Sequence, residues 1–318
     1  MGARAILRSS LPLLEIADAA RAGARYARAR MRHALVGIVF AGVALGAGAW
    51  LAAPARADET PLRFERDGAL VRSLSRNELT ARCGVTRVEV ADPYYAKAKT
   101  YLAYPLACAL ELGFGKPVSE HRGENFFLRA RDGYIKPASG ERLAEPGGWL
   151  AFADAERSGA GQANWDPIDR RQVDPGPYYL VWSGPGQNDP HRYPWPYQLV
   201  AIEIAPFEAR YPHTIPSGEP KGSAAWTGFA VFRSECVACH AINGEGGTIG
   251  PELNLPLSIV EYRPAAQLKS FIRDPAQFRY SSMPANPHLA EGQLDGLIAY
   301  FTAMQGRKHD PRRALPAP

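Results

Sequence analysis

The most restrictive feature of the chain is a pair of cysteines followed at once by a histidine, Cys236-Val-Ala-Cys239-His240. This C-x-x-C-H order is typical of covalent attachment of a c-type haem. Two thiols on one helical turn reach the two vinyl groups at one edge of a porphyrin, and the adjacent imidazole then lies beneath the iron as its ligand. A thioredoxin-like redox pair would need a βαβ pattern, and a zinc site would need a second Cys/His pair nearby. The sequence shows neither, so we expect one covalently bound haem c.

The second axial ligand of the iron is expected to be a methionine. Of the four Met in the chain, only Met283 and Met304 lie outside the N-terminal segment. Met283 belongs to an irregular, proline-containing loop, whereas Met304 falls within a helical pattern, where methionine more often packs in the core. We therefore expect His240 and Met283 as the axial pair, with Met304 or an open sixth position as the alternatives. A thioether ligand raises the reduction potential relative to a second histidine.

Residues 225–305 resemble a class I cytochrome c of the short bacterial type. The similarity rests on residues that flank the haem motif and on the closing helix: Gly228, Phe232, Gly246, Gly247, Gly250, Pro251, Glu252, Leu253, Met283, Pro284 and Tyr300. The resemblance implies an all-α domain whose first and last helices cross at Gly228, Phe232 and Tyr300. It also implies a hydrogen bond from the imidazole of the haem motif to the carbonyl of Pro251.

Residues 1–57 are expected to be a targeting segment. Residues 34–53 are apolar and uncharged, follow a basic stretch that begins at Met31, and lead into an Ala-Arg-Ala cleavage pattern before Asp58. This is the order of a secretory signal peptide, whose natural start would be Met31. An uncleaved membrane anchor is the alternative, because such a segment is long enough to span a bilayer. In either case we expect the rest of the chain to be periplasmic, and attached to the membrane only if this segment is retained.

The net charge of +5 does not indicate an acidic partner, because it is unevenly placed. The first 57 residues hold eight Arg, no Lys and two acidic residues, so the rest of the chain is close to neutral. A nucleic-acid partner is therefore not expected. The composition, 46% hydrophobic and 22% charged, is that of an ordinary globular protein.

After the targeting segment the chain divides at residues 206–224, a linker with several prolines and no apolar period. Residues 58–205 predict a β-rich α+β domain, residues 225–308 form the cytochrome-like domain, and the tail 309–318 is rich in Pro and Arg.

Aromatic and β-branched runs predict strands at Thr86–Ala91, Phe126–Ala130, Trp149–Phe152, Tyr178–Trp182 and Gln198–Ile204. Helical spacing predicts helices at Arg76–Cys83, Ala96–Leu112, Trp226–Val237, Ala265–Arg273 and Glu291–Met304. Because Pro105 lies inside the second of these, that helix is expected to kink or to begin only there.

The N-terminal domain resembles the sulfite-oxidase-like, molybdopterin-binding family. The similarity rests on the Asp132-Gly133-Tyr134 turn and on strands within residues 176–182 and 195–204. In that family a cysteine just after the strand that matches Thr86–Ala91 ligates molybdenum. The corresponding segment here, residues 91–97, contains no cysteine, and the targeting segment contains no twin-arginine pair. Bound molybdopterin is therefore not expected.

Two further cysteines, Cys83 and Cys108, are not explained by the haem motif. In an exported protein they are expected either to form a disulfide, which is favoured, or to stay as buried thiols. His121, His191 and His213 lack the spacing of metal ligands on one element, so we expect them to be solvated loop histidines.

These features predict a mono-haem cytochrome that transfers single electrons between redox partners, and they favour an electron-transfer protein or a subunit of a dehydrogenase system over an enzyme. The N-terminal domain would dock a dehydrogenase or another periplasmic redox protein, while its aromatic run Tyr193–Tyr197 is expected to pack at a strand edge rather than form a docking surface. The chain departs from class I cytochromes in lacking a basic cluster near the haem edge, where only Lys269, Arg273 and Arg279 are candidates for steering a partner. The alternatives are a molybdenum- and haem-containing oxidoreductase of the sulfite-oxidase type, and a haem sensor or ligand-binding protein with an open sixth position.

Overall fold

The computed structural model describes residues 60–158, 164–168 and 172–312. The predicted signal peptide and its cleavage site lie outside the described residues, as do the last residues of the tail. Within the described part, no helix has the length and apolar character that crossing a membrane requires. Both predicted domains belong to one compact unit, Pro54–Pro318.

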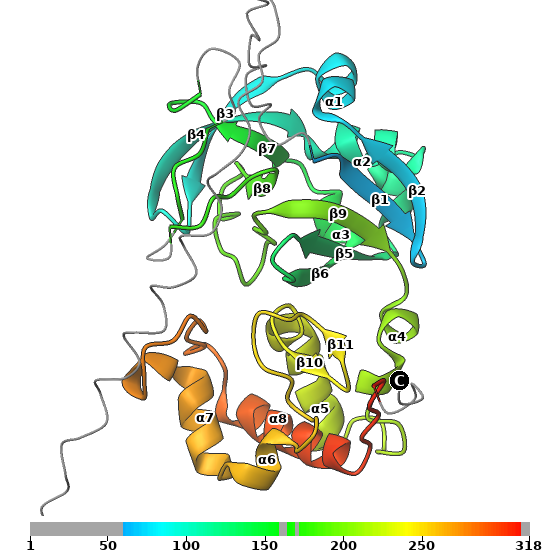
Figure 1. Ribbon diagram of the computed structural model, residues 1–318, viewed down its shortest axis with the longest axis vertical. Helices are drawn as coiled ribbons and strands as arrows, with labels where there is room; N and C mark the ends of the chain where they lie inside the picture. Colours follow the sequence, from blue (N-terminus) through cyan, green and yellow to red (C-terminus); the bar gives the residue numbers. More distant parts are fainter. Residues whose placement is uncertain (1–59, 159–163, 169–171, 313–318) are drawn as a thin grey trace, which may run out of the picture. The chain divides into compact units, whose positions relative to one another are not determined.

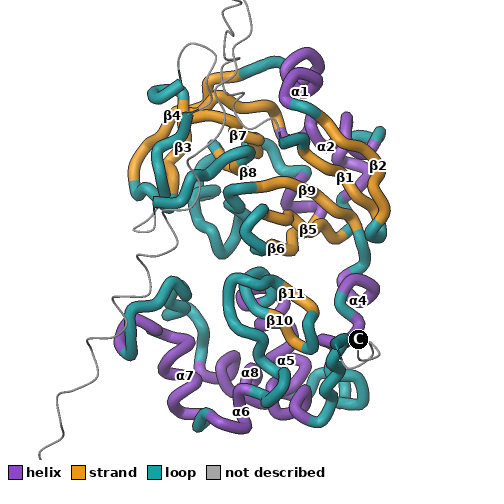
Figure 2. Tube along the Cα trace, viewed as in Figure 1, coloured by secondary structure: helices purple, strands orange, loops and turns teal. Residues whose placement is uncertain are grey.

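Two β-sheets form the N-terminal domain (Figures 1 and 2). The larger has the strand order β2-β1-β9-β5-β6, in which β1 and β9 are parallel and the other neighbours are antiparallel. Its strands are β1 (Leu62–Arg66), β2 (Ala69–Leu74), β5 (Asn125–Ala130), β6 (Ile135–Ser139) and β9 (Leu199–Ile204). The smaller sheet is antiparallel, with β3 (Thr86–Asp92), β4 (Lys97–Pro105), β7 (Gly148–Asp154) and β8 (Tyr179–Trp182) in that order. The five predicted strands are present, and β1, β2, β4 and β6 are additional.

One apolar cluster draws on both sheets, and its fully buried aromatic residues include Phe64, Tyr101, Tyr104, Phe126, Tyr179 and Trp182. Tyr193 and Trp195 are buried in the same cluster, so the predicted packing of this aromatic run is confirmed for those two residues. Four helical segments flank the strands: α1 (Arg76–Cys83), α2 (Leu106–Phe114), η1 (Val118–His121) and α3 (Gly140–Leu143). A disulfide between Cys83 and Cys108 joins α1 to α2, which confirms the favoured pairing.

The helix predicted over Ala96–Leu112 is wrong in its first half. Residues up to Pro105 form β4, where the alternate residues Lys99, Tyr101 and Ala103 are buried, as the period of two in a strand requires. Pro105 then stands at the start of α2, where its missing N–H would have no helical partner. The helix therefore begins only after the proline, and the leucine spacing before it is coincidental.

Two short helical segments interrupt residues 206–224, expected to be a linker: α4 (Phe207–Arg210) and η2 (Pro212–Thr214). Phe207 and Tyr211 are buried in the apolar cluster of the C-terminal domain. The hydroxyl of Tyr300 donates to the carbonyl of Thr214 at 2.6 Å. Part of this segment therefore packs as an element of the domain that follows it.

The C-terminal domain consists of helices and one short hairpin. Its elements are α5 (Ala224–Val231), the π-helical turn η3 (Phe232–Cys236), β10 (Ala241–Ile242), β11 (Glu245–Gly246), α6 (Ile259–Tyr262), α7 (Ala265–Arg273), η4 (Pro275–Gln277) and α8 (Glu291–Gln305). The three predicted helices are present, but the hairpin β10-β11 means that the domain is not purely helical. Helices α5 and α8 cross with their backbones in contact at Gly228 and Gly296. The rings of Phe232 and Tyr300 lie 5.3 Å apart at this crossing, which confirms the predicted contact.

Candidate haem-binding site

The Cys-x-x-Cys-His motif starts where α5 ends in the π-helical turn. The N–H of Val237 closes this wider turn by donating to the carbonyl of Phe232 at 2.8 Å. The chain then tightens, and the N–H groups of Cys239 and His240 donate to the carbonyl of Cys236 at 3.1 and 2.9 Å. Neither cysteine is in a disulfide, and both are half-buried. Two thiols and an imidazole thus follow one another around one turn, as attachment and ligation of a porphyrin require.

The imidazole of His240 is held by the backbone of the following loop. Its Nδ1 lies 2.8 Å from the carbonyl oxygen of Pro251, so the predicted hydrogen bond is confirmed. Since a carbonyl can only accept, Nδ1 donates and Nε2 is left as the metal-binding nitrogen. Burial lowers the pKa of His240, so the ring is neutral at pH 7, as a ligand must be.

Two glycines allow the loop to pack closely against this motif. A Cβ on Gly250 would lie 2.4 Å from Cε1 of His240, and a Cβ on Gly247 would lie 2.0 Å from the carbonyl oxygen of Ala238. A larger residue at either position would displace the imidazole or the turn that carries the cysteines. The donor set and this close packing therefore fit a c-type haem.

The free thiol of Cys236 is a weak acid in this environment. Burial, together with the carboxylate of Glu235, raises the pKa of Cys236 to about 12. Lys136 of the N-terminal domain opposes this effect, and its Nζ donates to the carbonyl of Ser234 at 3.0 Å. The thiol of Cys236 is thus protonated at neutral pH.

The two candidate methionines lie in different environments. Met304 is 1% exposed inside α8, and its carbonyl accepts a hydrogen bond from Asn254 at 2.8 Å. Met283 is half-buried at the edge of the same apolar cluster, and its N–H donates to the hydroxyl of Ser281 at 3.1 Å. Met304 is therefore a core-packing residue, whereas Met283 is a loop residue and the candidate for the sixth ligand.

The N-terminal domain contacts the haem motif directly, which the sequence analysis did not anticipate. The N–H of Ile135, the first residue of β6, donates to the carbonyl of Ala238 between the two cysteines at 3.0 Å. The N–H of Thr248 donates to the carbonyl of Gly133 at 3.1 Å. Near these contacts the sequence offers the turn at residues 132–134, a feature of the resemblance to the sulfite-oxidase-like family that does not predict a contact with the haem motif.

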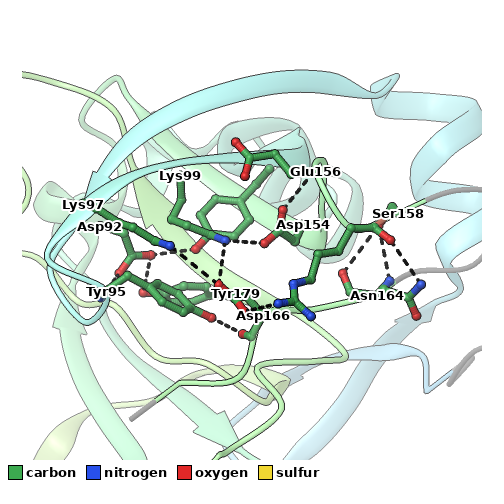
Figure 3. A network of polar contacts seen from close by, with 12 residues as sticks. Asp92, Tyr95, Lys97, Lys99, Asp154, Glu156, Ser158, Asn164, Asp166 and Tyr179 are labelled. Carbon is green, nitrogen blue, oxygen red and sulfur yellow. Dashed lines mark hydrogen bonds and ion pairs between the residues drawn. The ribbon is translucent and has the colours of Figure 1, made fainter.

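A buried carboxylate organises the cysteine-free segment that follows β3 (Figure 3). Asp92 accepts hydrogen bonds from the hydroxyls of Tyr101 and Tyr179 at 2.8 and 3.0 Å, and from the N–H of Tyr94 at 2.9 Å. Burial raises the pKa of Asp92. Through the N–H of Tyr94, Asp92 thus fixes the start of the turn that follows β3.

A buried ion pair lies in the same network (Figure 3). Lys99 and Asp154 are 3% and 0% exposed and contact each other, and Nζ of Lys99 also lies 3.3 Å from Asp166. Two charges removed from water in this way are stable only as a pair, so the contact fixes β4 against the end of β7.

The histidines outside the motif are not all solvated. His121 is 4% exposed, and its Nδ1 lies 2.6 Å from Glu124, so the prediction of a solvated loop histidine is wrong there. The buried ring packs at the edge of the N-terminal aromatic cluster. His213 is exposed and lies 2.6 Å from Glu245. His191 is exposed and faces Glu235, in the turn that precedes the haem motif.

The three basic candidates for steering a partner are engaged within the chain. Lys269 and Arg273 both pair with Glu291 at the start of α8. The guanidinium of Arg279 lies 5.4 Å from the centre of the Phe271 ring. Their charges are therefore partly neutralised or shielded on the domain itself.

Residues 225–305 match the family model for cytochrome c. This segment is a cytochrome c domain. This match supports a haem c cofactor and a role in electron transfer for the domain. The match covers the crossed helices, the motif and the loop of Met283.

Two relatives also match the chain over a limited length. The chain is 29% identical over 118 residues to cytochrome c oxidase subunit 2 of Alkalihalophilus pseudofirmus, a match that covers 34% of each chain. It is 30% identical over 99 residues to lupanine 17-hydroxylase (cytochrome c) of a Pseudomonas species, which covers 30% of this chain and 14% of the relative. The chain thus spans well under half the length of either relative.

Proposed function

We propose that the chain is an exported, periplasmic c-type cytochrome that carries one haem and transfers single electrons between redox partners. The haem is attached through the sulfurs of Cys236 and Cys239, and its iron is ligated by His240 and Met283. The observation that carries the proposal is the neutral imidazole of His240, fixed by Pro251 and following on one turn two cysteines that are not in a disulfide. The match to the cytochrome c family supports it.

When bound, the haem supplies one-electron chemistry between ferric and ferrous iron. The chain's own residues keep the ligand sphere constant. The hydrogen bond to Pro251 orients the ring of His240 and increases its basicity, and the absence of a side chain at Gly250 leaves the ring undisturbed. A thioether from Met283 as a second iron ligand would keep the coordination number the same in both oxidation states, so that little has to move during transfer.

The N-terminal domain is assigned to partner docking. Its contact between Ile135 and Ala238 reaches the residues between the two cysteines, so a partner held by this domain is close to the haem motif. The basic side chains of α7 are engaged with Glu291, which favours recognition through the N-terminal domain instead. A periplasmic redox protein or dehydrogenase is the partner class proposed, and the names of the relatives, an oxidase subunit and a hydroxylase, agree with redox partners.

The test is to express the chain with haem-maturation machinery and to measure its mass and its pyridine haemochrome spectrum. We expect one haem per chain and the spectrum of a haem with two thioether bonds. Changing both Cys236 and Cys239 to Ala should abolish covalent haem, while the matched control that changes Cys83 and Cys108 to Ser should retain it. Colourless protein at the apoprotein mass would overturn the proposal. Molybdenum near one atom per haem would instead favour the oxidoreductase alternative.

A further inference from the structure

Three metal-binding side chains from distant parts of the chain converge beside the haem motif. They are His191 of the N-terminal domain, Glu235 in the π-helical turn, and His288 in the loop before α8. Nδ1 of His191 lies 3.4 Å and Nε2 of His288 lies 3.7 Å from the same oxygen of Glu235, Oε2. The ligand atoms of all three lie within 4.8 Å of one another.

These separations match those of a metal site. With bonds of about 2.0–2.2 Å and tetrahedral angles, neighbouring donor atoms stand about 3.3–3.6 Å apart. The two distances to Glu235 are close to this range, and the imidazole rings of His191 and His288 lie 4.1 Å apart, tilted by 52° rather than stacked flat. Small side-chain rotations would bring the three donors around one ion.

The backbone at two of the three positions is fixed by other contacts. The N–H of His191 donates to the side chain of Asp189 at 2.9 Å. The loop of His288 is anchored on α7 by buried Asn286, whose N–H donates to the carbonyl of Arg273 at 3.0 Å. The third side chain, Glu235, is the least exposed, at 18%. The fold thus fixes the backbone near both histidines, whose side chains remain exposed.

The chemistry of the donors indicates the class of ion. Two imidazoles and one carboxylate are the ligand set of zinc and similar divalent transition metals, whereas calcium and magnesium prefer oxygen ligands alone. An ordinary surface ion pair explains this arrangement less well, because it gives no reason for two histidines to face one carboxylate oxygen.

We propose that His191, Glu235 and His288 bind one divalent transition metal ion of the zinc class, with water in the remaining position. The site lies next to Cys236 on one side, and on the other it shares a loop with Met283. A bound ion would therefore join three segments: the N-terminal domain, the haem-motif turn and the loop of the candidate sixth ligand. This site is separate from the haem and does not depend on the proposed electron transfer.

The test uses the haem-loaded protein, in which His240 is already occupied, after treatment with a chelator. Equilibrium dialysis against Zn²⁺ should give saturable binding of one ion per chain. The variants His191→Ala and His288→Ala should each weaken this binding by about tenfold or more. Glu235→Gln keeps the shape of the side chain but removes its negative charge, and it should weaken the binding of Zn²⁺ to a similar extent.

The matched control is His309→Ala. Like His191 and His288, His309 is an exposed histidine that lies against a second histidine: the centre of its ring is 3.6 Å from that of His213. It should leave the affinity for Zn²⁺ unchanged. Added Zn²⁺ should also raise the unfolding temperature of the wild type and of His309→Ala, but not that of His191→Ala. The proposal is wrong if the wild type binds no ion saturably, if His191→Ala and His288→Ala bind as the wild type does, or if the control loses the ion.

Discussion

A Cβ on Gly228 would lie 1.9 Å from the carbonyl oxygen of Gly296, so the backbones of α5 and α8 are in contact where the two helices cross. A Cβ on Gly296 would in turn lie 3.0 Å from the backbone nitrogen of Gly228. The ring of Tyr300 packs against Phe229 and Phe232 beside this point, at 5.7 and 5.3 Å. Because α5 continues into the haem motif, this crossing positions the two cysteines.

Replacing Gly228 with Ala should force the two helices apart. We expect Gly228→Ala to lower the free energy of unfolding by about 1–3 kcal/mol or more, measured by denaturant unfolding of the haem-loaded protein. Gly292→Ala in α8 is the matched control, because a Cβ there would meet nothing within 4 Å. It should be neutral or stabilising by up to about 1 kcal/mol. Equal effects of the two changes would contradict the close crossing.

Loss of the disulfide should weaken the N-terminal domain without affecting the haem. Cys83 and Cys108 are 25 residues apart and join α1 to α2. Changing both to Ser should lower the free energy of unfolding by about 2–5 kcal/mol, which urea titration followed by circular dichroism would measure. The absorbance spectrum of the haem should stay the same, and adding a reductant should destabilise the wild type but not the variant. An unchanged urea midpoint would count against a stabilising bridge.

The haem motif could be predicted because its chemistry is local in the sequence, whereas the helix crossing followed from the resemblance to class I cytochromes c. The spacing of Cys236, Cys239 and His240 already defines the order of thiols and imidazole around one turn. That resemblance placed Gly228 and Tyr300 at the crossing, where the structure has a close backbone approach at the first and a packed ring at the second. The hydrogen bond from His240 to Pro251 followed from the resemblance, and the structure bears it out.

Long-range contacts were not predictable from periodicity. Strand β4 was mistaken for helix because Leu102 happens to stand one helical turn before Leu106, and only pairing with β3 and β7 determines its conformation. The contact between Ile135 and Ala238 joins residues about a hundred positions apart, and nothing in either local sequence specifies the other. The proximity of His191 to Glu235 in the haem-motif turn could not be predicted either, because the two residues are distant in the sequence and only the fold brings them together.

The buried carboxyl of Asp92 should make stability depend on pH. Burial raises the pKa of Asp92, so the folded chain holds this proton more tightly than the unfolded chain does. Its contribution to the free energy of unfolding is therefore largest below the ordinary Asp pKa of about 4, and it is lost as the pH rises through the raised pKa. Asp92→Asn removes this dependence. The difference in unfolding free energy between wild type and variant should thus decrease as the pH rises across that window.

Urea unfolding at a series of pH values would check this, and Tyr101→Phe provides a second measurement. The hydroxyl of Tyr101 donates to Asp92 and lowers its pKa, opposing the effect of burial. Removing the hydroxyl should move the pH window upward. A pH profile that is the same for wild type, Asp92→Asn and Tyr101→Phe would show that this carboxyl does not titrate differently on folding.

Loss of Met283 should change the haem spectrum and the reduction potential, whereas loss of Met304 should change the stability of the fold. Met283→Ala should remove the thioether from the iron, abolish the weak far-red absorbance band of the oxidised state and lower the reduction potential. Met304→Ala empties a site that is 1% exposed in the core, so it should lower the free energy of unfolding by about 2–5 kcal/mol while the band remains. Absorbance spectra, redox titration and denaturant unfolding of both variants separate the two roles. If the band survives in Met283→Ala and is lost in Met304→Ala, the iron ligand is Met304. If the oxidised wild type has no such band, the sixth position is not held by a methionine.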